Sequence, residues 1–261
     1  MFGFNRYDFR LLLNLFRMSV RDRYLGSSLG SVWAIVNPLL MLSIYTYVFG
    51  FVFKIRIPGS ETTLAYVVWL ITAYGPWIST TEAIIASSTS VVGASGIVKN
   101  MAFKTELLPV AGALVGFISL AVSLSFLLIL LIVSGNTPSW HLLLLPVVVM
   151  LQFLLIIALG VWLSAITVFV RDVTQVLPNL LTVVMFFTPI FYPFDSMPLL
   201  VQQVSLVNPF YHLADAYRAV LTEHRLPSLG GLSFVALLSL IVLHFGLRSF
   251  RRAKGYFDSA L

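Results

Sequence analysis

Few side chains in this sequence could carry out covalent chemistry, and they lie far apart. The chain has no cysteine, and its four histidines are scattered at His141, His212, His224 and His244. It lacks the Gly-Lys-Ser/Thr of a nucleotide-binding P-loop and the His-Glu-x-x-His of a zinc protease. We therefore predict no catalytic residue, no metal site and no cofactor bound by this chain. If this chain moves a molecule uphill, the energy must come from a partner protein or from an ion gradient.

Glu82 is the one acidic residue inside a long apolar run, and carboxylates inside membranes are candidates for ion coupling. It lies near one end of that run, where its side chain can reach water. A polar contact between helices and a boundary residue that extends to the interface both fit this position. A single carboxylate near an edge gives little support to a proton relay.

The elements that must position these residues are membrane helices. Of the 261 residues, 59% are hydrophobic and only 10% are charged, whereas a soluble domain has about 25% charged residues. Because so few charges cannot cover a water-exposed surface, the composition excludes soluble enzymes, disordered chains and fibrous proteins. The apolar stretches are continuous, which disfavours a β-barrel. The net charge of +6 lies between apolar runs and indicates contact with membrane lipids rather than nucleic acid.

Six apolar runs predict an all-α polytopic membrane protein with six transmembrane helices in one domain, residues 1–261. The runs cover residues 29–53, 64–85, 110–133, 143–170, 173–192 and 229–247. Twelve of the 16 Lys and Arg residues fall before the first run, in the second-to-third and fourth-to-fifth loops, and in the C-terminal tail. Because positively charged loops stay in the cytoplasm, both termini are predicted to be cytoplasmic.

Residues 1–28 indicate an amphipathic helix at the membrane interface rather than a cleavable signal peptide. Four arginines and Asn14 recur at spacings of three or four residues (Arg6, Arg10, Asn14, Arg17 and Arg21), and apolar residues recur on another face. Such a helix lies in the interface with its arginines towards lipid phosphates. Arg6, Arg10 and Arg17 are the candidates for contact with a lipid pyrophosphate. Ordinary headgroup contact and a solvated helix are the alternatives.

The second-to-third loop is predicted to hold a short amphipathic helix over residues 96–108. It combines charged residues with apolar ones, a pattern typical of a helix that docks into a cleft of a partner protein. An elbow on the membrane surface is the alternative. The candidate partner contacts are Lys99, Met101, Phe103, Lys104 and Glu106.

Residues 194–228 are too apolar for an ordinary external loop and too interrupted to span a membrane. A helix start is predicted at residues 195–198, followed by a short helix over 199–207, a break at Asn208-Pro209 and a second helix over 210–221. Two short apolar helices suit a re-entrant periplasmic hairpin between the fifth and sixth spans. A loop that lies flat on the membrane is the alternative.

Four motifs occur in a fixed order along the chain. Residues 23–30 are Arg-Tyr-Leu-Gly-Ser-Ser-Leu-Gly, residues 169–173 are Phe-Val-Arg-Asp-Val, residues 188–193 are Thr-Pro-Ile-Phe-Tyr-Pro, and residues 208–210 are Asn-Pro-Phe. With these motifs, nearly the whole chain resembles the permease subunits of type-2 ABC exporters for polysaccharides. The most similar group is the Wzm-like O-antigen exporter family, with its capsule and teichoic-acid relatives.

This resemblance implies a homodimer with a continuous channel between the two copies. Two copies of a separate, Wzt-like ATPase would bind ATP and Mg²⁺. The helix over 96–108 is similar to the family's coupling helix, and the N-terminal helix to its interface helix. The hairpin is similar to the family's outer gate, for which the candidates are Asp195, Asn208, Pro209, Phe210, Asp215 and Arg218. The implied substrate is a polyprenyl-pyrophosphate-linked glycan that crosses the bacterial inner membrane.

Aromatic side chains are candidates for the walls of such a channel, because their rings can pack on the C–H faces of sugars. The candidates are Tyr45, Tyr47, Trp69, Tyr74 and Trp77, and an aromatic belt at the membrane interface is the alternative. Three other functions remain open from the sequence: an ABC exporter of a small hydrophobic molecule, an ion-coupled carrier, and a membrane enzyme for lipid-linked sugars. The enzyme would need clustered carboxylates such as Asp195, Asp215 and Glu223, which stabilisation of the hairpin explains equally well.

Overall fold

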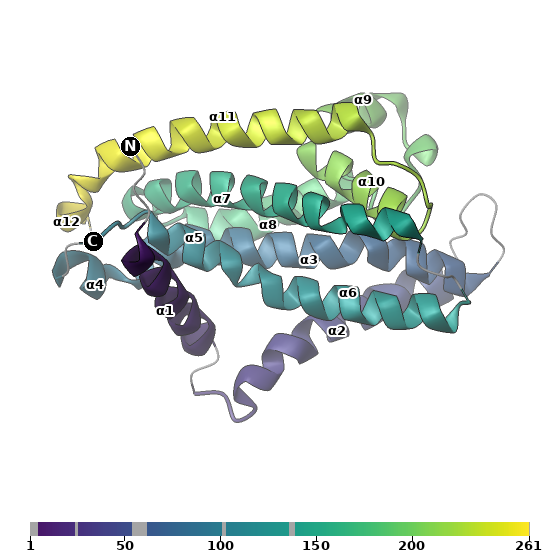
Figure 1. The fold of residues 1–261 in the computed structure, drawn as a ribbon, viewed down its shortest axis with the longest axis horizontal. Coiled ribbons are helices and arrows are strands. Elements are labelled where there is room, and N and C mark those ends of the chain that lie inside the picture. The colour runs from purple at the N-terminus through teal and green to yellow at the C-terminus, as the bar shows by residue number, and fades with distance from the viewer. Residues whose placement is uncertain (1–4, 24–25, 54–61, 101–102, 136–138, 261) are drawn as a thin grey trace.

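The computed structural model describes residues 5–23, 26–53, 62–100, 103–135 and 139–260, and these residues form helices without a strand. Four helical stretches run lengthwise side by side in Figure 1. They are α3 (Thr63–Gly93), α5 with α6 (Leu107–Leu114 and Gly116–Val133), α7 (Leu145–Phe169) and α11 (Leu229–Lys254). The prediction of an all-α fold is confirmed over these ranges.

Four stretches in the described part are long and apolar enough to cross a membrane, namely Gly30–Val52, Leu107–Val133, Trp140–Phe169 and Leu229–Tyr256. They correspond to the first, third, fourth and sixth predicted runs. The second run forms α3, which has 31 residues but many Ser and Thr side chains, and the fifth forms α8 (Val173–Phe187), which has 15 residues. The count of six spans therefore stays a prediction.

Helix α3 lies at the centre of the bundle, where it contacts α5, α6, α7, α8 and α10. Residues 66–80 are all buried. The hydroxyls on this stretch are satisfied by the helix itself, since Thr72 donates to the Val68 carbonyl at 2.8 Å and Thr80 donates to the Pro76 carbonyl at 2.9 Å. The polar residues of the second run are thus accommodated by burial among helices rather than by contact with water.

Glycines allow α5 and α6 to approach α3 closely. A Cβ atom added at Gly112 would lie 2.8 Å from the Ala86 carbonyl oxygen, and one added at Gly116 would lie 2.6 Å from the Ser79 carbonyl oxygen. The two glycines have the spacing of a Gly-x-x-x-Gly motif, which membrane helices use to pack without intervening side chains.

Two helices slant away from the bundle and approach each other near the linker that joins them (Figure 1). They are α1 (Arg6–Arg23) and α2 (Trp33–Tyr45), the latter preceded by the 3₁₀ turn η1 (Gly30–Val32) and continued by the π-helical η2 (Thr46–Val52). Gly26 and Gly30 have φ angles of +83° and +51°, a backbone region that favours glycine, so they set the course of this linker.

One end of the bundle, here called the terminal end, holds the first turns of α1, the end of α11, α4 (Ser95–Asn100) and α12 (Phe257–Ala260) (Figure 1). The helix predicted over 96–108 is shorter than expected. It ends at Asn100, and a non-helical segment precedes α5. A second apolar core at this end joins α1, α5, α7 and α11 around Leu15 and Phe250.

The opposite end, here called the hairpin end, holds η4 (Phe194–Ser196), α9 (Leu199–Val207) and α10 (Pro209–Leu221), and η3 (Trp140–Leu144) contacts α10. The predicted helix over 199–207 and the break at Asn208-Pro209 are confirmed. The Asn208 side chain accepts a hydrogen bond from the Phe210 N–H at 3.0 Å, and proline follows at the first helical position. The re-entrant placement of this hairpin stays a prediction.

Candidate functional site

The loop between α4 and α5 is held at the terminal end by ion pairs to the first and last long helices of the chain. Lys104 Nζ lies 2.5 Å from Asp8 Oδ2 on α1. Arg251 Nε on α11 donates to Glu106 Oε1 at 3.0 Å. Two of the predicted partner contacts, Lys104 and Glu106, therefore already bind other parts of the same chain.

Asp8 is the better buried partner in the first of these pairs. The hydrogen bond from Lys104, and then the N–H of Asn5 at 3.0 Å, lower the pKa of the Asp8 carboxyl below its ordinary value. The carboxylate is therefore charged at neutral pH and keeps its hold on the loop.

The remaining predicted partner contacts differ in how accessible they are. Lys99 is exposed on α4. Phe103 is half-buried against the second core, and its carbonyl accepts a hydrogen bond from Lys254 Nζ at 3.1 Å. Met101 lies outside the described residues. On this surface, the side chain of Lys99 is the one most freely presented to a partner.

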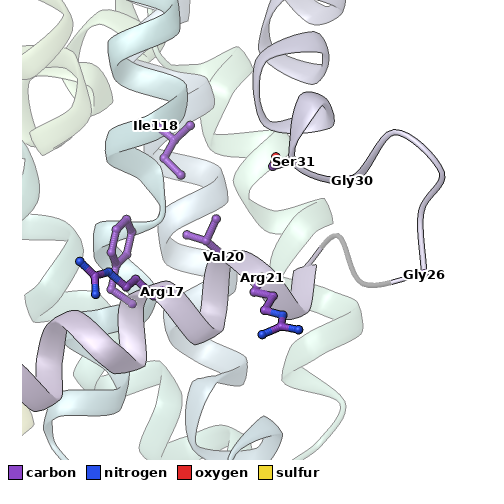
Figure 2. A pocket seen from close by; sticks show the side chains of 8 residues that line it. Arg17, Val20, Arg21, Gly26, Gly30, Ser31 and Ile118 are labelled. Atoms are coloured by element: carbon purple, nitrogen blue, oxygen red, sulfur yellow. The ribbon is translucent and has the colours of Figure 1, made fainter.

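A cavity of about 640 Å³ lies between α1, the linker and α6. Figure 2 shows Arg17 and Arg21 on α1 beside it, and Val20 pointing from α1 towards Ile118 of α6. Its walls are largely apolar, and Arg17 and Arg21 border it on the α1 side. Arg17 was predicted for lipid-pyrophosphate contact, whereas Arg21 was missed, although it lies four residues further along the same helix face.

The other two predicted arginines, Arg6 and Arg10, are exposed on α1 and do not line this cavity. They remain candidates for headgroup contact. The cavity thus separates Arg17 and Arg21, which line it, from Arg6, Arg10 and Arg23, which do not.

Glu82 joins three helices near the terminal end. Arg23 Nη2 at the end of α1 lies 2.9 Å from Glu82 Oε1, and the Ser119 hydroxyl of α6 donates to the other carboxylate oxygen. The Glu82 side chain is only 15% exposed. This arrangement is a polar contact between helices rather than a boundary residue in water, and Glu82 and Arg23 also line a second cavity of about 540 Å³.

At the hairpin end, Arg218 of α10 is 6% exposed and holds the chain after α8. It donates to the carbonyl oxygens of Pro189 at 2.7 Å and Ile190 at 2.9 Å. Its guanidinium carbon lies 3.6 Å from the ring centroid of Trp69 on α3, a cation–π distance. One predicted gate residue thus links α10, α3 and the segment after α8.

The other predicted gate residues lie on the same hairpin but are not all in contact. The Asn208 side-chain amide donates to Thr188 Oγ1 at 2.7 Å. Asp215 pairs with Arg225. Phe210 packs edge-on against Trp77, with ring centroids 5.3 Å apart. Asp195 is exposed, and Pro209 begins α10.

The five candidate channel aromatics do not share one surface. Trp69, Tyr74 and Trp77 are buried within the single chain, and Tyr45 is half-buried against Tyr74, with ring centroids 4.5 Å apart. Tyr47, by contrast, is 63% exposed. In this conformation the candidates on α3 belong to the core, and of the five candidates Tyr47, on η2, is the exposed one.

A buried polar network that the sequence analysis missed joins α3, α7 and α10. The Gln152 side-chain amide donates to the Pro76 carbonyl and to Thr80 Oγ1, both at 3.1 Å, and the Tyr217 hydroxyl donates to its oxygen. The signal was available, because Gln152 is the one amide inside the long apolar run 143–170. Among the described residues, no group of three or more His, Asp or Glu could hold a metal ion.

Comparison with known proteins gives one family. Residues 10–222 match the ABC-2 type transporter family. Over 244 residues, the chain is 30% identical to the O-antigen export system permease protein RfbA of Myxococcus xanthus. This alignment covers 91% of this chain and 90% of the relative.

Two further relatives cover the chain to a similar extent. The chain is 25% identical to the RfbA permease of Klebsiella pneumoniae, over 98% of this chain and 96% of the relative. It is 24% identical to the polysialic acid transport protein KpsM of Escherichia coli, over 91% of each. On these matches and its apolar helices, the chain is a membrane-embedded transport protein and belongs to the ABC-2 type transporter family.

Proposed function

We propose that this chain is the membrane-spanning subunit of an ATP-driven exporter for a polyprenyl-pyrophosphate-linked polysaccharide, O antigen or a similar surface glycan. The names of the relatives, which concern export of O antigen and transport of polysialic acid, support a polysaccharide cargo. The glycan would cross the bacterial inner membrane, with both termini of this multi-pass chain in the cytoplasm. In this scheme the chain is a transport subunit and not an enzyme.

The motor in this proposal is a separate ABC ATPase in two copies, which binds ATP and Mg²⁺. The printed sequence supports this division because it has no Gly-Lys-Ser or Gly-Lys-Thr. The ATPase would dock at the terminal end, on α4 and the loop that follows it. Because Lys104 and Glu106 join this loop to α1 and α11, movement of the loop would reach both helices.

The channel in this proposal lies between two copies of the chain. Exposed apolar side chains on α2 and α8, which include Ile44, Val176 and Leu180, supply a face that a second copy or membrane lipids would cover. Tyr47 and Phe51, whose stacked rings have centroids 6.5 Å apart, would contribute an aromatic wall. The buried Trp69 would reach the channel only if the hairpin moved away from α3.

The observation that carries the proposal is the cavity beside α1. Its apolar walls and the two arginines beside them match a ligand that has a long hydrocarbon chain and an anionic head, which is the chemistry of a polyprenyl pyrophosphate. The glycine-containing linker on its rim supplies a segment that can change course without strain on a side chain.

A matched pair of variants tests this assignment. Arg17→Gln with Arg21→Gln removes two charges from the cavity, and Arg6→Gln with Arg10→Gln removes two charges from the same helix outside it. We expect the first double variant to lose surface glycan and to accumulate lipid-linked glycan on the cytoplasmic side, while the second keeps export. If both double variants lost surface glycan equally at equal protein levels, the arginines would serve only in general contact with lipid headgroups.

Deletion of the gene distinguishes the proposed function from export of a small hydrophobic molecule. An apolar cavity of about 630 Å³ between α7, α8 and α11, lined by Trp162, Leu177 and Phe245, favours a small hydrophobic molecule as cargo. A small-molecule exporter predicts sensitivity to such compounds with surface glycan intact, whereas our proposal predicts loss of the glycan. An ion-coupled carrier is disfavoured because Glu82 is engaged by Arg23.

A further inference from the structure

We propose that a cavity at the hairpin end is a binding site for neutral sugar residues of the exported glycan. This cavity, here called the outer cavity, has a volume of about 430 Å³ and lies between α3, η4 and α10. That volume is within the usual range for small-ligand sites. The identity of the ligand as part of the cargo rests on the proposed function, whereas the sugar chemistry rests on the lining residues.

Aromatic rings form part of the wall of the outer cavity. Phe194 and Tyr211 stack with ring centroids 5.0 Å apart, and both are half-buried. Trp69 also lines the cavity, with Arg218 stacked over its ring. An aromatic ring with one accessible face can pack on the C–H face of a sugar, while its surroundings remain polar enough to meet the hydroxyls.

The polar lining can both accept and donate hydrogen bonds. Asp195, Asp215 and Glu223 supply carboxylate oxygens. Arg225 holds two of them, since it pairs with Asp215 and its Nε lies 2.7 Å from Glu223 Oε2. Asp195 makes no ion pair with any described residue, so its carboxylate is available to a ligand hydroxyl.

An independent observation places an unsatisfied donor at the same cavity. Arg218 lines it and is more than nine-tenths buried, yet its Nε has no hydrogen-bond partner among the described residues. A buried donor without a partner is unfavourable. Asp195, Asp215 and Glu223 do not accept a hydrogen bond from this Nε, and a hydroxyl oxygen in the cavity would satisfy it only after the side chains around the guanidinium move.

The balance of charge selects the class of ligand. Three carboxylates and Arg218 line the cavity, and Arg225 pairs with two of the carboxylates, so the local charge is net negative and disfavours phosphate, pyrophosphate and anionic headgroups. A neutral polyhydroxyl ligand fits both the aromatic rings and the carboxylates. The outer cavity would thus hold sugar residues of a glycan at the hairpin end, far from the arginine-lined cavity beside α1.

The test measures binding of the host's own glycan, released from its lipid, to the purified full chain with its ATPase in lipid nanodiscs. Ligand-detected NMR reports on the sugar protons. Tyr211→Ala removes the ring, Tyr211→Phe keeps it, and Asp195→Asn removes only charge. Trp140→Ala is the matched control, because Trp140 is an exposed aromatic in η3, which contacts α10, and it does not line the cavity.

We expect the unsubstituted chain to bind saturably, Tyr211→Ala and Asp195→Asn to weaken binding about tenfold, and Tyr211→Phe and Trp140→Ala to change it less than about threefold. The proposal would be overturned if Trp140→Ala weakened saturable binding as much as Tyr211→Ala does. Competition by inorganic pyrophosphate for the same binding would also overturn it. Absence of binding in a chain that exports glycan in cells refutes the outer cavity alone. Absence of glycan export in cells refutes the proposed function, whatever the binding result.

Discussion

Replacement of Gly116 by alanine should destabilise the bundle where α6 packs on α3. The added Cβ would lie 2.6 Å from the Ser79 carbonyl oxygen and 2.7 Å from the Ala83 Cβ, and neither is the end of a flexible side chain. Such overpacking costs about 1–3 kcal/mol. The shift also weakens the hydrogen bond from the Ser79 hydroxyl to the Gly116 carbonyl, now 2.8 Å, which contributes about 1 kcal/mol.

Alanine also has a better helix propensity than glycine, by about 0.8–1 kcal/mol, which offsets part of this loss. The net expectation is a decrease of about 1–3 kcal/mol in the free energy of unfolding. Ser119 lies one turn after Gly116, so movement of α6 would also separate its hydroxyl from Glu82. Export should therefore fall together with stability.

Gly93→Ala is the matched control, because an added Cβ there meets nothing within 4 Å. Equilibrium unfolding in bicelles or by detergent titration, with export measured in cells, compares the two variants. We expect Gly93→Ala to be neutral or stabilising by up to about 1 kcal/mol. The reasoning on close helix packing is refuted if Gly116→Ala is as stable as Gly93→Ala.

Three further predictions concern the terminal end. Glu82→Gln should weaken the α1–α3 contact and speed hydrogen exchange in the last turn of α1, and unchanged exchange would mean that the pair with Arg23 contributes nothing. Because the pKa of Asp8 is lowered, the stability that its carboxylate contributes is fully present above the ordinary value of 3.8 and is lost as the pH falls through the lower folded value. The melting temperature of the unsubstituted chain should therefore fall relative to that of Asp8→Asn only below about pH 4. A constant difference between the two melting temperatures across this pH range would contradict this. Lys99→Ala should reduce co-purification of the ATPase without a change in the melting temperature, because Lys99 is exposed on α4, whereas full co-purification would show that Lys99 is not part of the interface.

The hairpin end could be predicted in detail because its signals are local. Asn208 caps a helix that proline begins, and these two residues alone set the break between α9 and α10. The amphipathic helix at residues 6–23 was likewise visible from the spacing of its arginines. Such features depend on neighbours in sequence, and the structure has them where they were expected.

The burial of α3 could not be predicted, because its aromatic residues suit a channel wall as well as a core. Trp69 has the residue type of a channel wall, and only the packing of α10 and Arg218 over it makes it a core residue. The pair between Asp8 and Lys104 joins residues 96 positions apart, and the pair between Arg251 and Glu106 joins residues 145 positions apart. Contacts at that separation depend on the fold and leave no pattern in either segment.

The measurement that tests the central claim most directly is native mass spectrometry of the tagged chain, purified in mild detergent from its own host. The proposal predicts one assembly with two copies of this chain and two copies of a protein that carries a Walker A motif. It also predicts that ATP hydrolysis by this assembly rises when lipid-linked glycan is added. A homo-oligomer without an ATPase, from cells that still display the surface glycan, would contradict the account.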